Sequence, residues 1–270
     1  MRLLHIGDIV GKPGRQICVD AVRKLRLREK LDLVTANGEN AAAGSGITPA
    51  IYHELTDGGI DVITLGDHAF SRRDIFGTLR SQTRIVRPAN YPKEAPGREF
   101  TTFTTRGGVK VGIFVCVGRV FMAPADCPFH AADRVLKNMP DDVQVILMDF
   151  HAEATSDKQV MSRHLDGRVA AVIGTHTHIP TADERILPGG TAFQADIGMT
   201  GPHESIIGRR IDRVLEKTLT FRPAPFDVAT EDVRLNGAIV DIDDSTGRAT
   251  AIRRLCVTED DLRRWSEEDG

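Results

Sequence analysis

Short apolar segments alternate with amphipathic segments along most of the chain. The apolar segments are rich in valine and isoleucine, and they cover Leu3–Gly7, Leu31–Ala36, Asp61–Gly66, Lys110–Gly118, Val143–Phe150, Val169–Gly174 and Thr191–Ile197. They are too short for buried helices, and several are apolar on both faces, as strands of a covered sheet are. We therefore predict a strand at each of these segments.

The segments between the strands carry helical periodicity. Cys18, Ala21, Val22 and Leu25 recur at i, i+3, i+4 and i+7, opposite arginine and lysine, which predicts a helix packed on a sheet. Further helices are predicted over 48–57, 71–80, 130–138 and 156–165. Alternating strands and helices of this kind imply parallel βαβ units, so we predict the α/β class.

The pattern changes near the C-terminus. Residues 227–243 and 248–257 predict the two strands of an antiparallel hairpin. The acidic residues 259–270 predict a peripheral, solvated tail that frays. Because no linker-like segment interrupts the chain, we predict a single domain over residues 1–270.

Composition narrows the class of protein. Of the 270 residues, 41% are hydrophobic and 27% are charged, which is typical of a globular protein. A formal net charge of −3 argues against a stable complex with nucleic acid, which favours a basic excess. The four cysteines lie far apart, as in a reducing cytosol, and no apolar run approaches the roughly 18 residues of a membrane span. We therefore predict a cytoplasmic protein without a membrane segment, and leave assembly into a homo-oligomer open.

Polar side chains follow five of the predicted strands at their C-terminal ends. These side chains are Asp8, Glu39, Asn40, Asp67, His68, His151, His176 and His178. In α/β sheets, ligands bind at the C-terminal ends of the strands. Taken singly, each residue has a structural interpretation, such as Asp8 as a helix cap or Glu39 and Asn40 as a turn. Five independent structural explanations would have to coincide at one edge of a sheet, whereas one shared metal site explains all of these residues.

The mixture of carboxylate, amide and imidazole groups indicates the type of metal. Oxygen and nitrogen ligands without thiolate suit manganese, iron, cobalt or zinc. One ion takes about four to six ligands, whereas the set offers seven or eight donor groups, enough for two ions that share a bridging carboxylate. Two ions about 3.5–4 Å apart recur in sites for in-line displacement at phosphorus. We therefore predict a dinuclear centre at the strand ends.

Three further residues are candidates for substrate contacts. The segment GDIVGKPGR contains Lys12 and Arg15 in a glycine-rich turn after the first strand, where such turns often bind phosphate. Its spacing matches neither a GxGxxG fingerprint nor a Walker A loop, so a surface turn is the competing interpretation. The third candidate is His203, in the glycine-rich segment DIGMTGPHESIIG.

Five segments resemble one known family. GDIVGKPGR, NGENAAAGSGIT, DFHAEATSDK, GTHTHIPTAD and DIGMTGPHESIIG are similar, in order and spacing, to motifs of the YmdB-like branch of the calcineurin-type metallophosphoesterases. The resemblance runs from residue 3 to about residue 255. It implies an α/β fold in the form of a four-layer αββα sandwich, with a dinuclear metal centre at the C-terminal strand ends. It also implies phosphodiesterase activity on 2′,3′-cyclic nucleotides, with 3′,5′-cyclic AMP as a further substrate.

The resemblance gives a role to each residue at the strand ends. The implied ligands of one ion are Asp8, Glu39, Asn40 and His178, and those of the second ion are Glu39 as the bridge, Asp67, His151 and His176. His68 is the implied proton donor. The family pattern after the third strand is Gly-Asn-His followed by Trp-Asp, whereas this chain has Asp67 in place of the asparagine and Phe70-Ser71 in place of Trp-Asp. The expected ions are iron or manganese, with zinc or magnesium as alternatives.

The expected reaction is in-line attack on phosphorus by a hydroxide that bridges the two ions. Protonation of the leaving 2′-oxygen by His68 would convert a 2′,3′-cyclic nucleotide into a 3′-phosphomonoester. Two other interpretations stay open. An amidohydrolase also uses a His-x-His motif, although on the first strand of a barrel, whereas here the motif lies at 176–178. The other is a metal-stabilised regulatory or RNA-associated module with weak or no catalysis.

Overall fold

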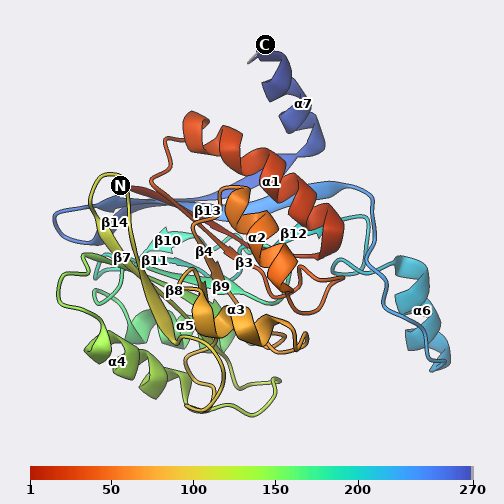
Figure 1. The fold of residues 1–270 in the computed structure, drawn as a ribbon, viewed down its shortest axis with the longest axis horizontal. Helices are drawn as coiled ribbons and strands as arrows, with labels where there is room; N and C mark the ends of the chain where they lie inside the picture. Colours follow the sequence, from red (N-terminus) through yellow and green to blue (C-terminus); the bar gives the residue numbers. More distant parts are fainter. Residues whose placement is uncertain (269–270) are drawn as a thin grey trace.

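The computed structural model describes residues 1–268 and contains two β-sheets (Figure 1). The strands of the first sheet are β1 (Arg2–Ile6), β2 (Asp8–Ile9), β3 (Leu33–Asn37), β4 (Val62–Thr64), β5 (Ile85–Val86), β12 (Met199–Pro202), β13 (Val233–Asp243) and β14 (Arg248–Thr258). Their order is β2-β12-β13-β1-β3-β4-β5, with β14 beside β13. Because β1, β3, β4 and β5 run parallel, their C-terminal ends share one edge, whereas β13 runs antiparallel to β1.

The second sheet is also largely parallel. Its strands are β6 (Phe100–Thr104), β7 (Lys110–Val117), β8 (Val145–His151), β9 (Ala171–Thr175), β10 (Arg185–Ile186) and β11 (Ala192–Gln194), in the order β10-β11-β9-β8-β7-β6. Strands β7, β8, β9 and β11 are parallel, and β6 and β10 are antiparallel edge strands. All seven predicted apolar segments form strands of the two sheets, so the α/β class is confirmed.

Seven helices are present among the described residues. They are α1 (Gly11–Arg28), α2 (Pro49–Asp57), α3 (Ile75–Ser81), α4 (Pro128–Asn138), α5 (Thr155–His164), α6 (Ile211–Thr220) and α7 (Glu259–Glu268). The first five correspond to the predicted helices, although α3 begins at Ile75 and not at residue 71. Helix α2 begins where its sequence predicts, because the Thr48 hydroxyl accepts a hydrogen bond from Ile51 N–H and Pro49 occupies the first turn.

Three clusters of buried hydrophobic residues hold the elements together. The first lies between the first sheet and helices α1, α2 and α3. The second lies between the two sheets, and the third lies between the second sheet and helices α4 and α5. Side chains alternate between clusters along a strand: in β1, Leu4 and Ile6 face the helices and Leu3 faces the other sheet. The two sheets therefore pack face to face, with helices on their outer faces.

The segment GKPGR differs from its prediction. It is the first turn of α1, which begins at Gly11, and does not form a turn before the helix. Gly11 has φ +60°, a conformation that glycine adopts at little cost. Pro13 is tolerated within the first turn because the N–H it lacks would have no partner within the helix.

The C-terminal tail is also more ordered than predicted. Residues 259–268 form α7, whose Leu262 and Trp265 pack against the first hydrophobic cluster, so the expected fraying end is wrong for these residues. The guanidinium of Arg28 lies 5.1 Å from the centre of the Trp265 ring, which ties α7 to α1. The last two residues of the predicted tail, 269 and 270, lie outside the described part of the chain.

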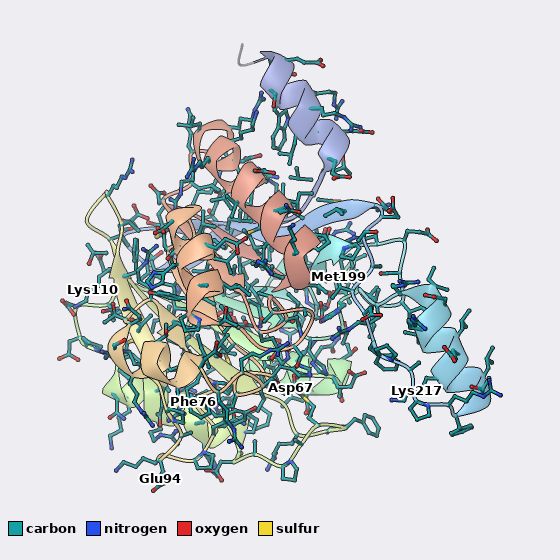
Figure 2. All side chains as sticks on the ribbon, turned by 45° about the vertical axis from the view of Figure 1, so that its right-hand side comes forward. Asp67, Phe76, Glu94, Lys110, Met199 and Lys217 are labelled. Carbon is teal, nitrogen blue, oxygen red and sulfur yellow. The ribbon has the colours of Figure 1, made fainter. Side chains whose placement is uncertain are left out.

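Helix α6 stands apart from both sheets. No helix is predicted over its residues from the sequence pattern, and it projects at the right of Figure 1. Lys217 on α6 lies far from Asp67 in Figure 2. In the described part of the chain none of the α6 side chains is buried, and Leu219 is 75% exposed. Its ten residues therefore lack the packed face that usually stabilises a helix this short.

The architecture decides one of the open alternatives. The described strands form two open sheets and no closed barrel, which is incompatible with the barrel of an amidohydrolase. Among the described helices, none has both the length and the apolar character needed to cross a bilayer.

Candidate metal centre

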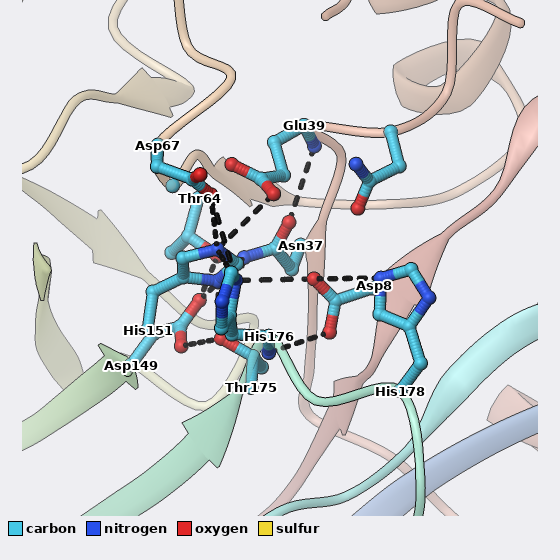
Figure 3. A network of polar contacts seen from close by, with 12 residues as sticks. Asp8, Asn37, Glu39, Thr64, Asp67, Asp149, His151, Thr175, His176 and His178 are labelled. Atoms are coloured by element: carbon cyan, nitrogen blue, oxygen red, sulfur yellow. Dashed lines mark hydrogen bonds and ion pairs between the residues drawn. The ribbon is translucent and has the colours of Figure 1, made fainter. Parts of the chain in front are cut away.

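The polar residues at the strand ends meet where the two sheets face each other (Figure 3). From the first sheet come Asp8 in β2, Glu39 and Asn40 after β3, and Asp67 and His68 after β4. From the second sheet come His151 at the end of β8, and His176 and His178 after β9. The site is therefore built from both sheets.

Four of these residues converge on one point. Glu39, Asp67, His151 and His176 each offer one ligand atom within 4.8 Å of the others. His151 Nε2 lies 3.1 Å from Glu39 Oε1 and 3.0 Å from Asp67 Oδ1. His176 Nδ1 lies 3.5 Å from Asp67 Oδ1. These are the four residues expected to hold the second ion.

Asp8, Asn40 and His178 lie beside this group. Asp8 is fully buried and Asn40 is 3% exposed, yet Asp8 Oδ1 and Asn40 Oδ1 find no hydrogen-bond partner among the described residues. His178 Nε2 lies 4.0 Å from Asp8 Oδ1. Buried polar oxygens without a partner are costly, so two of them beside an imidazole indicate a site for a bound group.

The His-x-His segment has an unusual backbone. His176 has φ 98° and His178 has φ 67°, in the left-handed region that residues other than glycine seldom adopt. The N–H of His176 donates to Asp8 Oδ2 at 3.1 Å, and His178 Nδ1 donates to the Ile207 carbonyl at 3.0 Å. Two strained residues at one turn are typical of a functional site. The turn directs both imidazoles toward the carboxylates of the first sheet.

A second layer of contacts fixes the ring of His151. Thr175 Oγ1 donates to Asp149 Oδ1 at 2.7 Å and lies 2.9 Å from His151 Nδ1. Because that hydroxyl proton is already used, Thr175 accepts from His151 Nδ1–H, so Nε2 is the ring nitrogen that faces the centre. Asn37 Nδ2 donates to the other oxygen of Asp149 at 3.1 Å.

His176 has a carboxylate partner on its outer side. Glu153 Oε2 lies 3.2 Å from His176 Nε2, the ring nitrogen opposite the one that faces His151. A carboxylate behind a ligand histidine fixes its tautomer and raises its basicity. Glu153 is half-exposed and follows His151 by two residues, in the segment DFHAE.

His68 occupies a different position from the other histidines. The backbone N–H of His68 donates to Glu39 Oε2 at 2.9 Å, and the ring atom Nδ1 lies 3.2 Å from Glu39 Oε1. The hydrogen bond to Glu39 raises the pKa of His68 above its ordinary value. The side chain is 40% exposed, so it borders the centre and is open to solvent.

The donor set fits divalent cations. Burial raises the pKa of Asp8, whereas for Glu39 burial is outweighed by contacts with His151 and His68, which lower the pKa to about 2. Burial disfavours the charged form of His151, but the carboxylates of Glu39 and Asp67 raise its pKa well above the usual value. The carboxylates of Glu39 and Asp67 in the converging group, with Asp8 beside it, favour a bound positive charge, which oxygen- and nitrogen-binding metal ions supply.

Two of the three candidates for substrate contacts lie away from the centre. Lys12 is exposed and lines a cavity of about 900 Å³ between α1, residues 226–233 and α7, and no residue of the centre is among the described residues that line it. His203 Nδ1 donates to the Gly201 carbonyl and its Nε2 accepts from Asn236 Nδ2, both at 2.9 Å. Because both ring nitrogens are occupied, His203 is a structural residue of its own loop.

Arg15 is engaged in holding the loop after Asn40. Its guanidinium donates to the carbonyl of residue 41 at 2.7 Å and pairs with Glu54 at 2.9 Å. Arg72 donates to the carbonyls of residues 42 and 45, and Arg209 donates to those of residues 43 and 44. Three arginines therefore bind five consecutive carbonyls, and the guanidinium of Arg15 contributes one of these bonds.

Comparison with known proteins agrees with this geometry. The sequence model of the family described as "YmdB-like protein" matches residues 4–255. The 2′,3′-cyclic-nucleotide 2′-phosphodiesterase of Bacillus subtilis (strain 168) is 42% identical over 97% of this chain and 99% of its own length. The chain belongs to the YmdB-like family.

Other YmdB-like relatives match over similar lengths. A putative phosphatase/phosphodiesterase of Mycoplasma genitalium is 30% identical over 97% of this chain and 94% of its own. The crystal structure of a hypothetical protein from Thermus thermophilus superposes with a TM-score of 0.90 at 40% identity, over 96% of this chain and all of that one. A novel phosphatase from Mycoplasma pneumoniae gives a TM-score of 0.89 at 29% identity, over 99% and 96% of the two chains.

Several residues of this YmdB-like site were not among the sequence candidates. They are Asn37, Asp149, Glu153 and Thr175, which contact His151, His176 or each other. For Asp149 a signal existed, because a residue two positions before His151 on a strand points to the same face. Thr175 and Asn37 gave no comparable signal, since only the packing of β3 against β8 and β9 brings them together.

Proposed function

We propose that this YmdB-like protein is a dinuclear metal-dependent phosphodiesterase that hydrolyses 2′,3′-cyclic nucleotides, with 3′,5′-cyclic AMP as a further substrate. The chain is a phosphoric diester hydrolase, as the names of its relatives indicate. The observation that carries the proposal is the convergence of Glu39, Asp67, His151 and His176, contributed by both sheets, on one point.

Two ions account for the full set of polar groups. Glu39, Asp67, His151 and His176 would hold one ion, and Asp8, Asn40 and His178, with Glu39 shared, would hold the other. The partnerless oxygens of Asp8 and Asn40 support the second of these sites. Bound ions would lower the pKa of coordinated water and offset the negative charge on the phosphate oxygens. With helices outside two facing sheets, we assign the fold to the four-layer αββα sandwich of the metallophosphoesterases.

His68 would act as the general acid. Its raised pKa favours the protonated form, and its exposed ring can reach a substrate that enters from solvent. The proton would pass to the 2′-oxygen as its bond to phosphorus breaks, so that water and a 2′,3′-cyclic nucleotide give a 3′-phosphomonoester. Such assistance typically contributes about 10²–10⁴-fold to the rate. Glu39 holds His68 in place through two contacts.

The remaining predictions accompany this function. Carboxylate, amide and imidazole donors suit iron or manganese, with zinc or magnesium as alternatives. We propose a single domain over residues 1–270 that acts in the cytoplasm on a small phosphodiester and forms no stable nucleic-acid complex. Assembly into a homo-oligomer fits the exposed apolar residues of α6.

A direct assay tests the proposal. The purified chain, loaded with Mn²⁺, is incubated with 2′,3′-cyclic AMP or 3′,5′-cyclic AMP, and chromatography separates 3′-AMP, 2′-AMP and 5′-AMP. We expect 3′-AMP from the first substrate. His130→Ala, which removes an exposed histidine on α4, is the matched control for His68→Ala and should retain full activity. Full metal occupancy without turnover would favour the regulatory or RNA-associated module, and 2′-AMP as the product would refute the leaving-group assignment.

A further inference from the structure

A buried ion pair lies behind the His-x-His turn. Lys158 Nζ on α5 lies 2.7 Å from Asp196 Oδ2, and both side chains are 2% exposed. Lys158 follows the ligand strand β8 in the segment DFHAEATSDK, and Asp196 lies between β11 and β12. Neither residue contacts the cluster of carboxylates and imidazoles directly. An effect of this ion pair on the cluster therefore depends on the groups that donate hydrogen bonds to Asp196.

Asp196 holds the residue between the two ligand histidines. Its Oδ2 accepts hydrogen bonds from Thr177 N–H at 3.0 Å and from Thr177 Oγ1 at 2.8 Å. Its Oδ1 accepts from the N–H of Gly198 at 2.9 Å. Both carboxylate oxygens are therefore used, and one of them carries three donors when Lys158 is included. Charge-assisted hydrogen bonds of this kind are stronger than neutral ones.

The turn needs such a restraint because its backbone is strained. Thr177 lies between His176 and His178, both of which have positive φ. A left-handed conformation is energetically unfavourable for a residue other than glycine and persists only where the surroundings enforce it. Fixing Thr177 from behind fixes the direction of both neighbouring imidazoles toward the first sheet.

The Lys158 side chain passes close to the backbone of β9. A Cβ on Gly174 would lie 3.0 Å from Lys158 Cδ and 1.8 Å from the carbonyl oxygen of residue 195. Glycine at this strand position is required mainly by the close approach of the residue 195 backbone, and the Lys158 side chain also packs against it on the way to Asp196. A buried carboxylate without a cation would be expensive, so Lys158 makes the position of Asp196 possible.

We propose that Lys158 and Asp196 are positioning residues that hold the His176-Thr177-His178 turn in its metal-binding conformation. This inference rests on the proposed metal centre, although it does not depend on which phosphodiester is hydrolysed. A merely structural pair would stabilise the contact between α5 and the second sheet without affecting metal affinity. A positioning pair changes metal affinity even where the fold is retained.

A matched pair of substitutions at Thr177 gives the first test. Thr177→Val keeps the shape and the backbone N–H but removes the hydroxyl that donates to Asp196, whereas Thr177→Ser keeps the hydroxyl. We measure Mn²⁺ binding to the metal-depleted full chain by calorimetry, and thermal unfolding without metal. Partners of this kind typically change metal affinity about 10–100-fold, so we expect at least tenfold weaker binding for Thr177→Val and near wild-type binding for Thr177→Ser. Equal affinity in all three proteins would overturn the proposal.

A double substitution tests the ion pair itself. Lys158→Met with Asp196→Leu removes both buried charges together, a change that proteins often tolerate. We expect the double variant to fold and to bind Mn²⁺ at least tenfold more weakly. Lys110→Met, which breaks an exposed pair with Asp142, is the control and should leave affinity unchanged. Wild-type affinity in the double variant would refute the proposal, and if that variant does not fold, the Thr177 pair decides.

The metal measurements separate this inference from the proposed function. Wild-type protein that binds two ions but hydrolyses no cyclic nucleotide would contradict the proposed function while the affinity comparison still decides the role of Lys158 and Asp196. Full activity on 2′,3′-cyclic AMP together with unchanged affinity in Thr177→Val would contradict only the positioning role.

Discussion

The Nε2 atom of His151 lies 3.0 Å from the Nδ1 atom of His176, with the two rings inclined at 70° to each other. Each ring uses its other nitrogen in an outer contact, His151 with Thr175 and His176 with Glu153. Two imidazole nitrogens held this close can share a proton or a cation. The nearby carboxylates of Glu39 and Asp67 favour a cation with more than one charge.

The first prediction concerns His68→Ala. We expect this variant to keep both metal ions and to lose about 10²–10⁴-fold in turnover of 2′,3′-cyclic AMP, because His68 would donate a proton and not bind metal. A p-nitrophenyl phosphodiester, whose leaving group needs no proton, should lose much less. Elemental analysis and kinetics on both substrates check this. Loss of metal, or equal losses on the two substrates, would contradict the assignment.

Glu39 and Asn40 should differ in their effect on metal content. Glu39 touches His151 and His68 and is expected to contact both ions, whereas Asn40 offers one neutral oxygen to a single ion. Glu39→Ala should therefore lose most of both ions, and Asn40→Ala should keep at least one. Metal content per chain, measured after removal of free metal, distinguishes them. Equal content in the two variants would refute the bridging role.

The carboxylate of Asp67 should give a lower phosphodiesterase activity with divalent ions than an asparagine at the same position. Its carboxylate adds one negative charge to the centre where the family pattern has a neutral asparagine, so a centre with two divalent ions attracts an anionic diester less strongly. We expect Asp67→Asn to raise kcat/KM with Mn²⁺ several-fold. Both proteins are compared across pH at full metal occupancy. An unchanged or lower kcat/KM would count against this charge argument.

Glu153→Gln should weaken metal binding without affecting the fold. Glu153 is half-exposed, and its contact with His176 Nε2 orients a ligand ring. We expect about 10–100-fold weaker Mn²⁺ binding and unchanged thermal unfolding of the metal-free protein. Glu94→Gln, at an exposed position at the lower edge of Figure 2 and away from Asp67, is the matched control. If both variants bind metal equally well, Glu153 has no such role.

The fifth prediction concerns acid stability and Asp149. Burial alone would raise the pKa of this carboxyl, but contacts from His5, His151 and Thr175 lower it to about 2. A folded-state pKa below the unfolded value stabilises the fold at neutral pH, and this stabilisation is lost as pH falls from about 4 to 2. Asp149→Asn should therefore cost ~2–3 kcal/mol at pH 7 and about 1 kcal/mol less at pH 3. Urea unfolding in EDTA at both pH values measures this, and equal costs would contradict it.

The sequence pattern predicts the strands better than the ends of the chain. Apolar runs such as Lys110–Gly118 coincide with strands because both faces of each sheet are covered, which leaves continuous hydrophobic segments. Two-residue strands such as β2 and β5 carry no pattern of their own. Helix α6 has an amphipathic pattern in Ile211, Val214, Leu215 and Leu219, from which no helix was predicted, and its apolar face is not buried against either sheet.

The residues proposed as ligands could be grouped from the sequence because each lies at the end of a strand, and strand ends meet at one edge. The contacts that hold these residues in place were not predictable from the sequence. Asp196 and Lys158 lie 38 residues apart in the chain, and only the docking of α5 on the second sheet brings them together. The contact of Arg15 with the carbonyl of residue 41 was not predictable for a similar reason, since a cation beside a glycine-rich segment suggests phosphate and gives no sign of a backbone partner 26 residues away.

The division of the centre between two sheets has a consequence for how each molecule is made. Asp8 and His176 are separated by 168 residues, so the ribosome releases them on the order of ten to thirty seconds apart. One edge of β1 also stays unpaired until β13 has been synthesised, because β13 pairs with β1 along that edge. The Met1 amino group, just before β1, likewise donates to the carbonyl of residue 242 in β13. Until the second half is made, the first half of the chain therefore lacks His151, His176 and His178 of the second sheet. Completion of the proposed metal centre would be a late event, after the two ends of the first sheet have met.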